Sequence, residues 1–181
     1  IMGPTGSGKS TVLRTIYMDV NVDKGKILFN NYNVSRVKKR EIPYIRREIG
    51  MIFQDYKLLE DRTVYDNVAL PLQICGYKSN LIKDKVFSML DKVNLGNKEK
   101  LLPGNLSGGE RQRISIARAL VKDPALILAD EPTGNLDPII SNEILDLLEE
   151  ASQSLGTAVL MSSHNFPLIQ PRKKKFIELD Q

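Results

Sequence analysis

The feature that most constrains this chain is a glycine-rich segment close to its first residue. Residues 3–10 read Gly-Pro-Thr-Gly-Ser-Gly-Lys-Ser and fit the pattern Gly-x4-Gly-Lys-Ser/Thr. Glycines let backbone N–H groups turn inward around a polyphosphate without Cβ clashes. A helix that begins near Lys9 would point its positive dipole end at the same anion. Because Ile1-Met2 reads as the end of a buried strand, the pattern predicts a strand, a phosphate-binding loop and a helix in that order.

This loop assigns chemistry to particular side chains. Lys9 is expected to reach the β- and γ-phosphates, and the Ser10 hydroxyl to ligate Mg²⁺. Asp130 follows the apolar run 125–129, so we expect it at a buried strand end, where Mg²⁺ needs a second anchor. Glu131 is then placed to orient or deprotonate a water that attacks the γ-phosphate. A GTP switch protein would need Asn-Lys-x-Asp, and the nearest segment, 97–100, lacks the Asp.

Apolar spacing along the chain predicts strands alternating with helices, which indicates a parallel sheet covered on both faces. The block 56–122 breaks this alternation because it is helical throughout. We therefore expect one domain, 1–181, in which an α/β core of 1–55 and 123–181 carries a helical subdomain at 56–122. The expected strands are 26–29, 49–53, 125–129, 157–161 and 175–179, and the expected helices are 9–19, two between 63 and 93 divided near Gly76, 107–121 and 139–155.

Composition excludes several classes of protein. With 181 residues, 41% of them hydrophobic, the chain can bury a core without a disulfide, and its single Cys75 cannot form an internal one. No stretch offers the roughly 20 mostly apolar residues of a membrane span, and an intracellular location is expected. The net charge of +4 is concentrated in basic stretches at 36–47 and 172–175. Charge alone leaves open a solvated face, a nearby anionic lipid or nucleic acid.

A second motif carries a family resemblance. Residues 106–113, Leu-Ser-Gly-Gly-Glu-Arg-Gln-Arg, stand before the acidic strand and resemble the signature motif of ABC-type ATPases. The other family elements occur in the family's order, with Gln54 as the Q-loop glutamine, 135–137 as the D-loop and His164 as the switch histidine. The resemblance runs across essentially the whole chain. It implies a P-loop NTPase (RecA-like) fold, of the α/β class, whose N-terminal strands are missing from this sequence.

The signature segment also has a physical reading of its own. Ser107-Gly108-Gly109 opens a helix and is therefore either a second anion site or a plain helix cap. One nucleotide cannot easily use both this segment and the loop 3–10 within a single subunit. A head-to-tail homodimer would let the two segments close on each ATP from opposite sides, and the resemblance implies this arrangement with two ATPs.

The resemblance further implies a set of site residues. Contacts to ATP are expected from Gly3, Pro4, Thr5, Gly6, Ser7, Gly8, Lys9, Ser10 and Thr11. Contacts to the ATP of the second copy are expected from Leu106, Ser107, Gly108, Gly109, Glu110 and Gln112, beside the D-loop residues Asn135, Leu136 and Asp137. Catalysis is expected from Lys9, Gln54, Glu131 and His164, and Mg²⁺ coordination from Ser10, Gln54 and Asp130.

Two departures from the family pattern stand out. Family members usually carry an aromatic residue that stacks on adenine in a strand before the phosphate loop, and that region is absent from this sequence. The acidic residue that usually follows the switch histidine is replaced by Asn165. The adenine contact therefore has no assigned residue, and the support for His164 differs from the family's.

The interval between Gln54 and Leu106 indicates which branch of the family the chain resembles. It holds only a compact helical subdomain with no heptad run, which argues against the DNA-repair relatives and against nucleic acid as a partner. It favours a subunit that docks on an integral membrane protein. Segments 38–55 and 58–72 are similar to the cell-division branch, which implies ATP hydrolysis coupled to a membrane subunit that regulates cell-wall hydrolysis. The expected location is the cytoplasmic face of the bacterial inner membrane at the division site.

Two alternatives to that branch remain at the level of sequence. Lipoprotein-release and macrolide-export ATPases share the catalytic motifs. From another class, a scaffold protein could use ATP only as a structural ligand, although it would be expected to lose Glu131.

Overall fold

The computed structural model describes residues 1–179 and is built on a three-stranded parallel sheet. The strands β3 (Ile49–Ile52), β4 (Leu126–Asp130) and β5 (Ala158–Ser162) lie in that order. In register, Ile49 pairs with Leu126, and Leu126 pairs with Ala158. The chain start continues the sheet beyond β5, because the backbone N–H of Ser163 donates to the Ile1 carbonyl at 3.0 Å.

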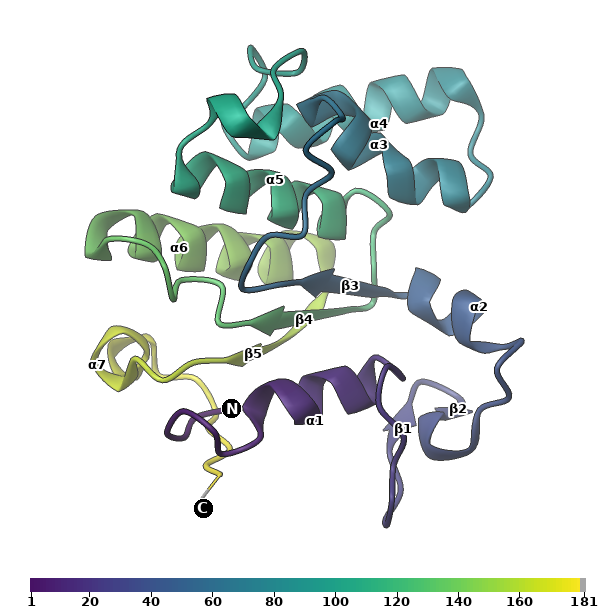
Figure 1. The fold of residues 1–181 in the computed structure, drawn as a ribbon, viewed down its shortest axis with the longest axis vertical. Coiled ribbons are helices and arrows are strands. Elements are labelled where there is room, and N and C mark those ends of the chain that lie inside the picture. The colour runs from purple at the N-terminus through teal and green to yellow at the C-terminus, as the bar shows by residue number, and fades with distance from the viewer. Residues whose placement is uncertain (180–181) are drawn as a thin grey trace.

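Side chains alternate between the two faces of this sheet, as the period of two in a strand requires. On one face Ile49, Met51 and Leu128 pack with Leu13 of α1 (Lys9–Ile16) and with Ile45. The opposite face packs Ile52, Ile127 and Ala129 against the helices that Figure 1 shows above the sheet. These helices are α3 (Val64–Ile74), α4 (Ser79–Lys92), α5 (Gly108–Leu120) and α6 (Pro138–Leu155).

Helix boundaries follow from local chemistry. Reciprocal capping boxes open α3, between Thr63 and Asp66, and α5, between Ser107 and Glu110. The helix α6 begins after Asp137, whose carboxylate accepts from two backbone N–H groups, and ends at Gly156 with φ 66°. These caps fix the residue at which each of the three helices starts.

The smaller elements lie at the two edges of the sheet. A hairpin of β1 (Leu28–Phe29) and β2 (Tyr32–Asn33) is followed by a 3-10 turn, Val34–Arg36, and by α2 (Ile42–Arg47). Near the other edge, α7 (Phe166–Ile169) leads into a 3-10 turn, Gln170–Arg172. Away from the sheet, in the helical block, another 3-10 turn, Pro103–Asn105, precedes α5. No helix within residues 1–179 is long and apolar enough to cross a membrane.

A parallel sheet with helices on both faces is confirmed, and the expected strands 49–53, 125–129 and 157–161 all belong to it. The strand expected at 26–29 is shorter and belongs to the separate antiparallel hairpin. The expected strand at 175–179 is wrong, because only a β-bridge forms there, between Glu178 and Met2. Met2 pairs with the backbone on both sides of Glu178, since its N–H donates to the Ile177 carbonyl at 2.8 Å and its carbonyl accepts from the Leu179 N–H at 2.9 Å. The helix α2 was not expected from the sequence.

The helical block 56–122 shares a hydrophobic core with the sheet. Residues of α3, α4 and α5 join Ile52 and Ile127 in one cluster. The helix α5 lies so close to β3 that a Cβ added to Gly50 would stand 2.7 Å from the carbonyl oxygen of Ala119. The block is therefore tied to the sheet through α5, and its division from the core as a subdomain stays a prediction.

A lysine ties α2 and β3 to the turn after α5. The Lys122 ammonium donates to the carbonyl oxygens of Arg46 at 2.7 Å and Ile49 at 2.8 Å. Burial lowers the pKa of Lys122 to about 8, from the ordinary value of 10.5. As pH rises from about 8 to 10.5 the folded protein releases this proton before the unfolded chain does, so the contribution of Lys122 to stability rises with pH.

We therefore predict a pH-dependent difference between the native protein and Lys122→Met. As pH rises from about 8 to 10.5, the free energy of unfolding, measured by urea denaturation, should increase for the native protein relative to Lys122→Met. Lys92→Met, at an exposed lysine, should show no such trend. A difference between native protein and Lys122→Met that stays constant with pH contradicts the assignment.

Candidate functional site

The candidate site lies where the parallel strands end. Figure 1 shows the loop before α1, the start of α6 and the carboxyl ends of β4 and β5 at the same edge of the sheet. In open α/β sheets this edge collects strand carboxyl ends and helix N-termini, and ligands bind there. The segments that the sequence singled out for phosphate and Mg²⁺ binding meet at this edge.

The loop 3–8 has the geometry of an anion cradle. Gly6 and Gly8 have φ values of 89° and 93°, in the left-handed region that side chains disfavour. A Cβ added to Gly3 would lie 2.6 Å from the Ser7 Oγ. That hydroxyl is buried and has no hydrogen-bond partner in the described chain. Because α1 lacks a side-chain cap, the N–H groups of its first turn are free to bind an anion.

The Lys9 side chain folds back onto the start of this loop. This side chain is 5% exposed, and its ammonium donates to the carbonyl oxygens of Gly3 and Pro4 at 2.9 Å each. The same ammonium lies 3.7 Å from the Oε1 of Glu131. The cation thus stands between the loop and the acidic end of β4. Pro4 and Thr5 are exposed at the tip of the loop, and Thr11 is exposed on α1.

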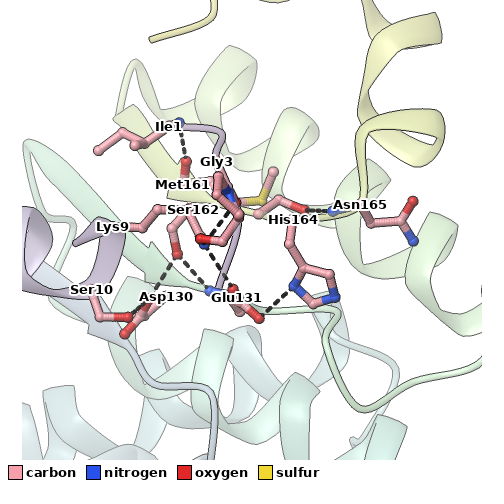
Figure 2. A network of polar contacts seen from close by, with 12 residues as sticks. Ile1, Gly3, Lys9, Ser10, Asp130, Glu131, Met161, Ser162, His164 and Asn165 are labelled. Atoms are coloured by element: carbon pink, nitrogen blue, oxygen red, sulfur yellow. Dashed lines mark hydrogen bonds and ion pairs between the residues drawn. The ribbon is translucent and has the colours of Figure 1, made fainter. Parts of the chain in front are cut away.

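Figure 2 shows a serine on each side of Asp130. The Ser10 hydroxyl donates to Oδ1 of Asp130 at 2.8 Å, and the Ser162 hydroxyl donates to the same oxygen at 2.7 Å. Ser10 and Asp130 present oxygen atoms, which Mg²⁺ prefers as ligands, and it usually takes few protein ligands beside phosphate and water. Residues 1–179 contain no cluster of three or more His, Cys, Asp or Glu that could hold a metal ion. The donor set therefore fits a magnesium ion shared with a phosphate.

Glu131 occupies a strained position directly after β4. Its φ is 44°, a conformation that costs a non-glycine residue about 1–2 kcal/mol. Surrounding contacts hold it there, because its N–H donates to the Ser162 Oγ at 3.0 Å and its carbonyl accepts from the Gly134 N–H at 3.0 Å. The carboxylate is 13% exposed and lies between Lys9 and His164.

His164 completes the network shown in Figure 2. Its Nδ1 lies 2.8 Å from the Oε2 of Glu131, and its imidazole is about half exposed. Asn165 supports the histidine loop without adding charge, since its Oδ1 caps α7 at the Leu168 N–H and its own N–H donates to the Ser163 Oγ. Both residues line a small cavity of about 80 Å³, together with Glu131, Thr133, Gly134, Leu136 and Ser163.

The signature segment begins α5 on the opposite face of the sheet from α1 (Figure 1). Ser107 and Glu110 close a capping box, and a hydrogen bond from Lys98 lowers the pKa of the Glu110 carboxyl. A Cβ on Gly109 would lie 2.8 Å from the Cγ2 of Ile140, so close packing on α6 requires glycine there. Ser107 and Gly108 are exposed.

Two residues expected to contact the second ATP do not reach the surface. Leu106 is buried, and Gln112 is fully buried on the side of α5 that faces the core. In this conformation neither can touch a nucleotide held by another copy, because Leu106 packs into the core before α5 begins and Gln112 lies on the buried side of that helix. The surface-accessible residues expected to contact the second ATP are Ser107 to Glu110, with Glu110 held in the capping box and by Lys98. Of the D-loop residues, Asn135 is exposed, Leu136 is half-buried, and Asp137 caps α6.

Gln54 lies apart from the polar network. It is exposed in the turn after β3, and no hydrogen bond of its side chain is found in residues 1–179. Two and three residues further on, Tyr56 and Lys57 have φ values of 60° and 48°. Arg118 of α5 donates to both of their carbonyl oxygens at 2.6 Å and so holds the strained turn. The structure therefore joins Lys9, Ser10, Asp130, Glu131 and His164, whereas Gln54 and Ser107–Gly109 stand outside this group.

Two contributors were not found from the sequence. Ser162 joins Asp130 to the backbone of Glu131, and Arg118 supports the turn after Gln54. The available signal for Ser162 was its position, because a serine ends an apolar strand two residues before His164. No comparable signal marks Arg118, because its carbonyl partners lie 61 and 62 residues away in sequence.

Comparisons with known proteins agree with this geometry. The model of the ABC transporter family matches residues 1–134. The cell division ATP-binding protein FtsE of Escherichia coli (strain K12) is 50% identical over 179 residues, which are 99% of this chain and 80% of that protein. FtsE of Bacillus subtilis (strain 168) is 45% identical over 99% of this chain and 78% of its own length. FtsE of Haemophilus influenzae is 48% identical over 100% and 83%.

Solved structures extend the likeness to three dimensions. A dimeric post-hydrolysis state of the ATP-binding cassette MJ0796, bound to ADP and Pi, superposes with a TM-score of 0.83 at 34% identity. The match covers 92% of this chain and 74% of that one. A second dimeric structure of MJ0796, described as a bacterial ABC transporter cassette, gives a TM-score of 0.84 over 93% and 75% of the two chains.

We predict that Ser162→Ala destabilises the protein. The substitution removes the only side-chain partner found within residues 1–179 for the Glu131 N–H, and one of two donors to Asp130. A buried group left unpaired costs about 1–3 kcal/mol, which urea denaturation would measure. Ser154→Ala, on the exposed side of α6, should stay within about 0.5 kcal/mol of the native protein. Equal stability of the two variants contradicts the bridging role.

Proposed function

The chain belongs to the ABC transporter family of ATP-binding domains, and we propose that it is the ATP-hydrolysing subunit of an FtsE-type complex that acts in cell division. One observation carries the proposal beyond family membership. A single carboxylate, Glu131, lies between the loop-bound Lys9 and His164, directly beside the oxygen pair of Ser10 and Asp130. This arrangement supports the reaction of ATP with water to give ADP and phosphate.

The residues of the loop bind and orient the triphosphate. Lys9 exchanges the carbonyl oxygens of Gly3 and Pro4 for phosphate oxygens, so a cation already stands at the loop when ATP arrives. The free N–H groups of the loop and of α1, together with the unpartnered Ser7 hydroxyl, surround the remaining phosphate oxygens. Ser10, Asp130 and Gln54 are the proposed Mg²⁺ ligands, and the ion, when bound, neutralises phosphate charge.

Glu131 and His164 handle the attacking water. Once phosphates draw Lys9 away, the Glu131 carboxylate is free to orient the water and accept its proton. His164 keeps this carboxylate in place through Nδ1 and contacts the γ-phosphate. Positioning and electrostatic stabilisation supply most of the catalysis in phosphoryl transfer. Each of these side chains should therefore matter to the rate.

ABC cassettes form dimers, and both solved structures of the cassette MJ0796 are dimeric. The proposed form here is a head-to-tail homodimer in which Ser107, Gly108 and Gly109 of one copy close on the ATP held by residues 3–10 of the other. The position of α5 and α1 on opposite faces of one sheet supports this, because one chain cannot bring both helix ends to a single nucleotide. The D-loop residues 135–137 adjoin this interface.

Similarity to FtsE over almost the whole chain supports the cellular role. The proposed partner is an integral membrane subunit of the FtsX type, and ATP hydrolysis drives the regulation of cell-wall hydrolysis through it. The proposed location is the cytoplasmic face of the bacterial inner membrane at the division site. Within the chain, 1–55 and 123–181 form the ATP-binding core, and 56–122 forms the helical subdomain that carries the signature motif.

Removing the loop cation should abolish nucleotide binding. Lys9→Ala deletes the buried ammonium that meets the phosphates, so binding of MgATP, measured by isothermal titration calorimetry, should fall by at least about 100-fold. Lys24→Ala removes the same charge from an exposed lysine outside the loop 3–10. This control variant should bind MgATP like the native protein. Unchanged affinity in Lys9→Ala contradicts the assignment of the loop.

Removing the base should separate binding from hydrolysis. Glu131→Gln keeps the shape of the side chain but cannot accept a proton, so steady-state phosphate release should fall by at least about 100-fold while ATP binding persists. Size-exclusion chromatography with MgATP should then show a trapped dimer. Glu178→Gln is the matched control. Undiminished phosphate release in Glu131→Gln contradicts the role, and absence of release from the native protein indicates the scaffold alternative.

A further inference from the structure

The positive charge of the chain is concentrated in one segment, residues 24–47, which we call the basic lobe. It contains eight Lys or Arg residues and a single acidic residue, Glu41. Since the whole chain carries 26 basic and 22 acidic residues, the remainder has three more acidic than basic residues. The net charge of +4 therefore comes entirely from the basic lobe, and the rest of the protein is mildly acidic.

Seven of the eight cations of the basic lobe are exposed and have no ion-pair partner within residues 1–179. Only Arg46 has a carboxylate within ion-pair distance in residues 1–179, namely Asp19 at 3.7 Å. The other seven are solvent-exposed without an ion-pair partner in the described chain: Lys24, Lys26, Arg36, Lys38, Lys39, Arg40 and Arg47. Charges that served only to stabilise the fold would be expected to show partners.

The second basic stretch, 172–175, behaves differently. Arg172 pairs with Asp146 and Glu149, and Lys174 lies 3.5 Å from Glu149. Carboxylates of α6 thus offset part of its charge. This contrast in ion pairing distinguishes the basic lobe from the stretch 172–175, which therefore provides a matched control.

Apolar side chains stand exposed among these cations. Leu28 is 64% exposed and Tyr44 is 61% exposed. The Arg47 guanidinium lies 5.0 Å from the centre of the Tyr44 ring. Aromatic residues beside Lys and Arg, with an aliphatic side chain nearby, are the composition that favours the interface between lipid headgroups and acyl chains.

The lobe is also separate from the nucleotide site. Figure 1 shows β1, β2 and α2 near the end of the sheet opposite to the loop before α1. A ligand on the lobe would therefore leave the nucleotide site and α5 free. From charge, exposure and position together, we propose that the basic lobe is a docking surface for the anionic headgroups of a membrane. This goes beyond the ATPase and its membrane subunit and depends on neither.

The shape of the lobe favours lipid over nucleic acid. Each strand of its hairpin has two residues, and α2 has six residues including Pro43. Neither element is long enough to lie in a DNA groove in the way a recognition helix or β-ribbon does. Leu28, the most exposed apolar side chain here, cannot stack on a base but can enter a headgroup layer.

The expected effect follows from the charge count. Each Lys or Arg near an anionic leaflet contributes roughly five-fold in membrane affinity. Replacing Lys38, Lys39 and Arg40 together by Ser should therefore weaken binding by about 100-fold. Because these side chains are exposed, the triple variant should fold like the native protein, which circular dichroism verifies.

The test is co-sedimentation of the chain, without nucleotide or membrane subunit, with phosphatidylglycerol-containing vesicles and with pure phosphatidylcholine vesicles. We expect salt-sensitive binding to the anionic vesicles only. Lys38→Ser/Lys39→Ser/Arg40→Ser should abolish it, whereas Lys173→Ser/Lys174→Ser/Lys175→Ser should retain most of it. Leu28→Ser/Tyr44→Ser should weaken the part of the binding that resists salt.

Several results would overturn the proposal. Equal binding to both kinds of vesicle removes the electrostatic basis, and equal loss in the two triple variants shows a response to net charge alone. Binding to a DNA duplex or an RNA strand with no binding to vesicles indicates a nucleic-acid surface instead. None of these outcomes depends on ATP hydrolysis, so failure here and failure of the proposed function are distinguishable.

Discussion

The site depends on one shared acceptor, the Oδ1 atom of Asp130. Two hydroxyls converge on it, from Ser10 at the start of α1 and from Ser162 at the end of β5. Ser10 lies 120 residues before Asp130 in the chain, and the two contacts fix the phosphate loop against the acidic strand end. Since Ser162 also accepts from the Glu131 N–H, the same contact sets the backbone from which the proposed base projects.

The charges around this point are balanced within the chain itself. Lys9 is buried, and its partners are two loop carbonyls and the nearby Glu131 carboxylate. A triphosphate can replace these partners without leaving the cation unpaired, because phosphate oxygens are better acceptors for an ammonium than carbonyl oxygens. The left-handed backbone of Glu131 is held by its neighbours. The site is therefore organised before a nucleotide arrives, which is what electrostatic catalysis requires.

The sequence anticipated the parts that local patterns encode. The loop 3–10, the buried strand before Asp130 and the helix that opens after Ser107 follow from spacing and residue type. Long-range contacts left no local pattern, so Arg118 and Ser162 were missed. The strand expected at 175–179 was wrong, because residue type along a segment does not show whether a ladder forms, and only a bridge between Glu178 and Met2 is found there. The motif around Ser107 did not reveal that Leu106 and Gln112 face the core, since a motif gives order along the chain and not burial.

What remains to be tested most directly is the proposal that the N-termini of α1 and α5, on opposite faces of one sheet, serve a single reaction. A crystal structure of Glu131→Gln grown with MgATP measures this. We expect two copies related by a two-fold axis, with the Ser107 hydroxyl of one within hydrogen-bond distance of the γ-phosphate on the other's loop. A nucleotide bound on the loop of an isolated copy, with every Ser107 facing bulk water, would contradict it.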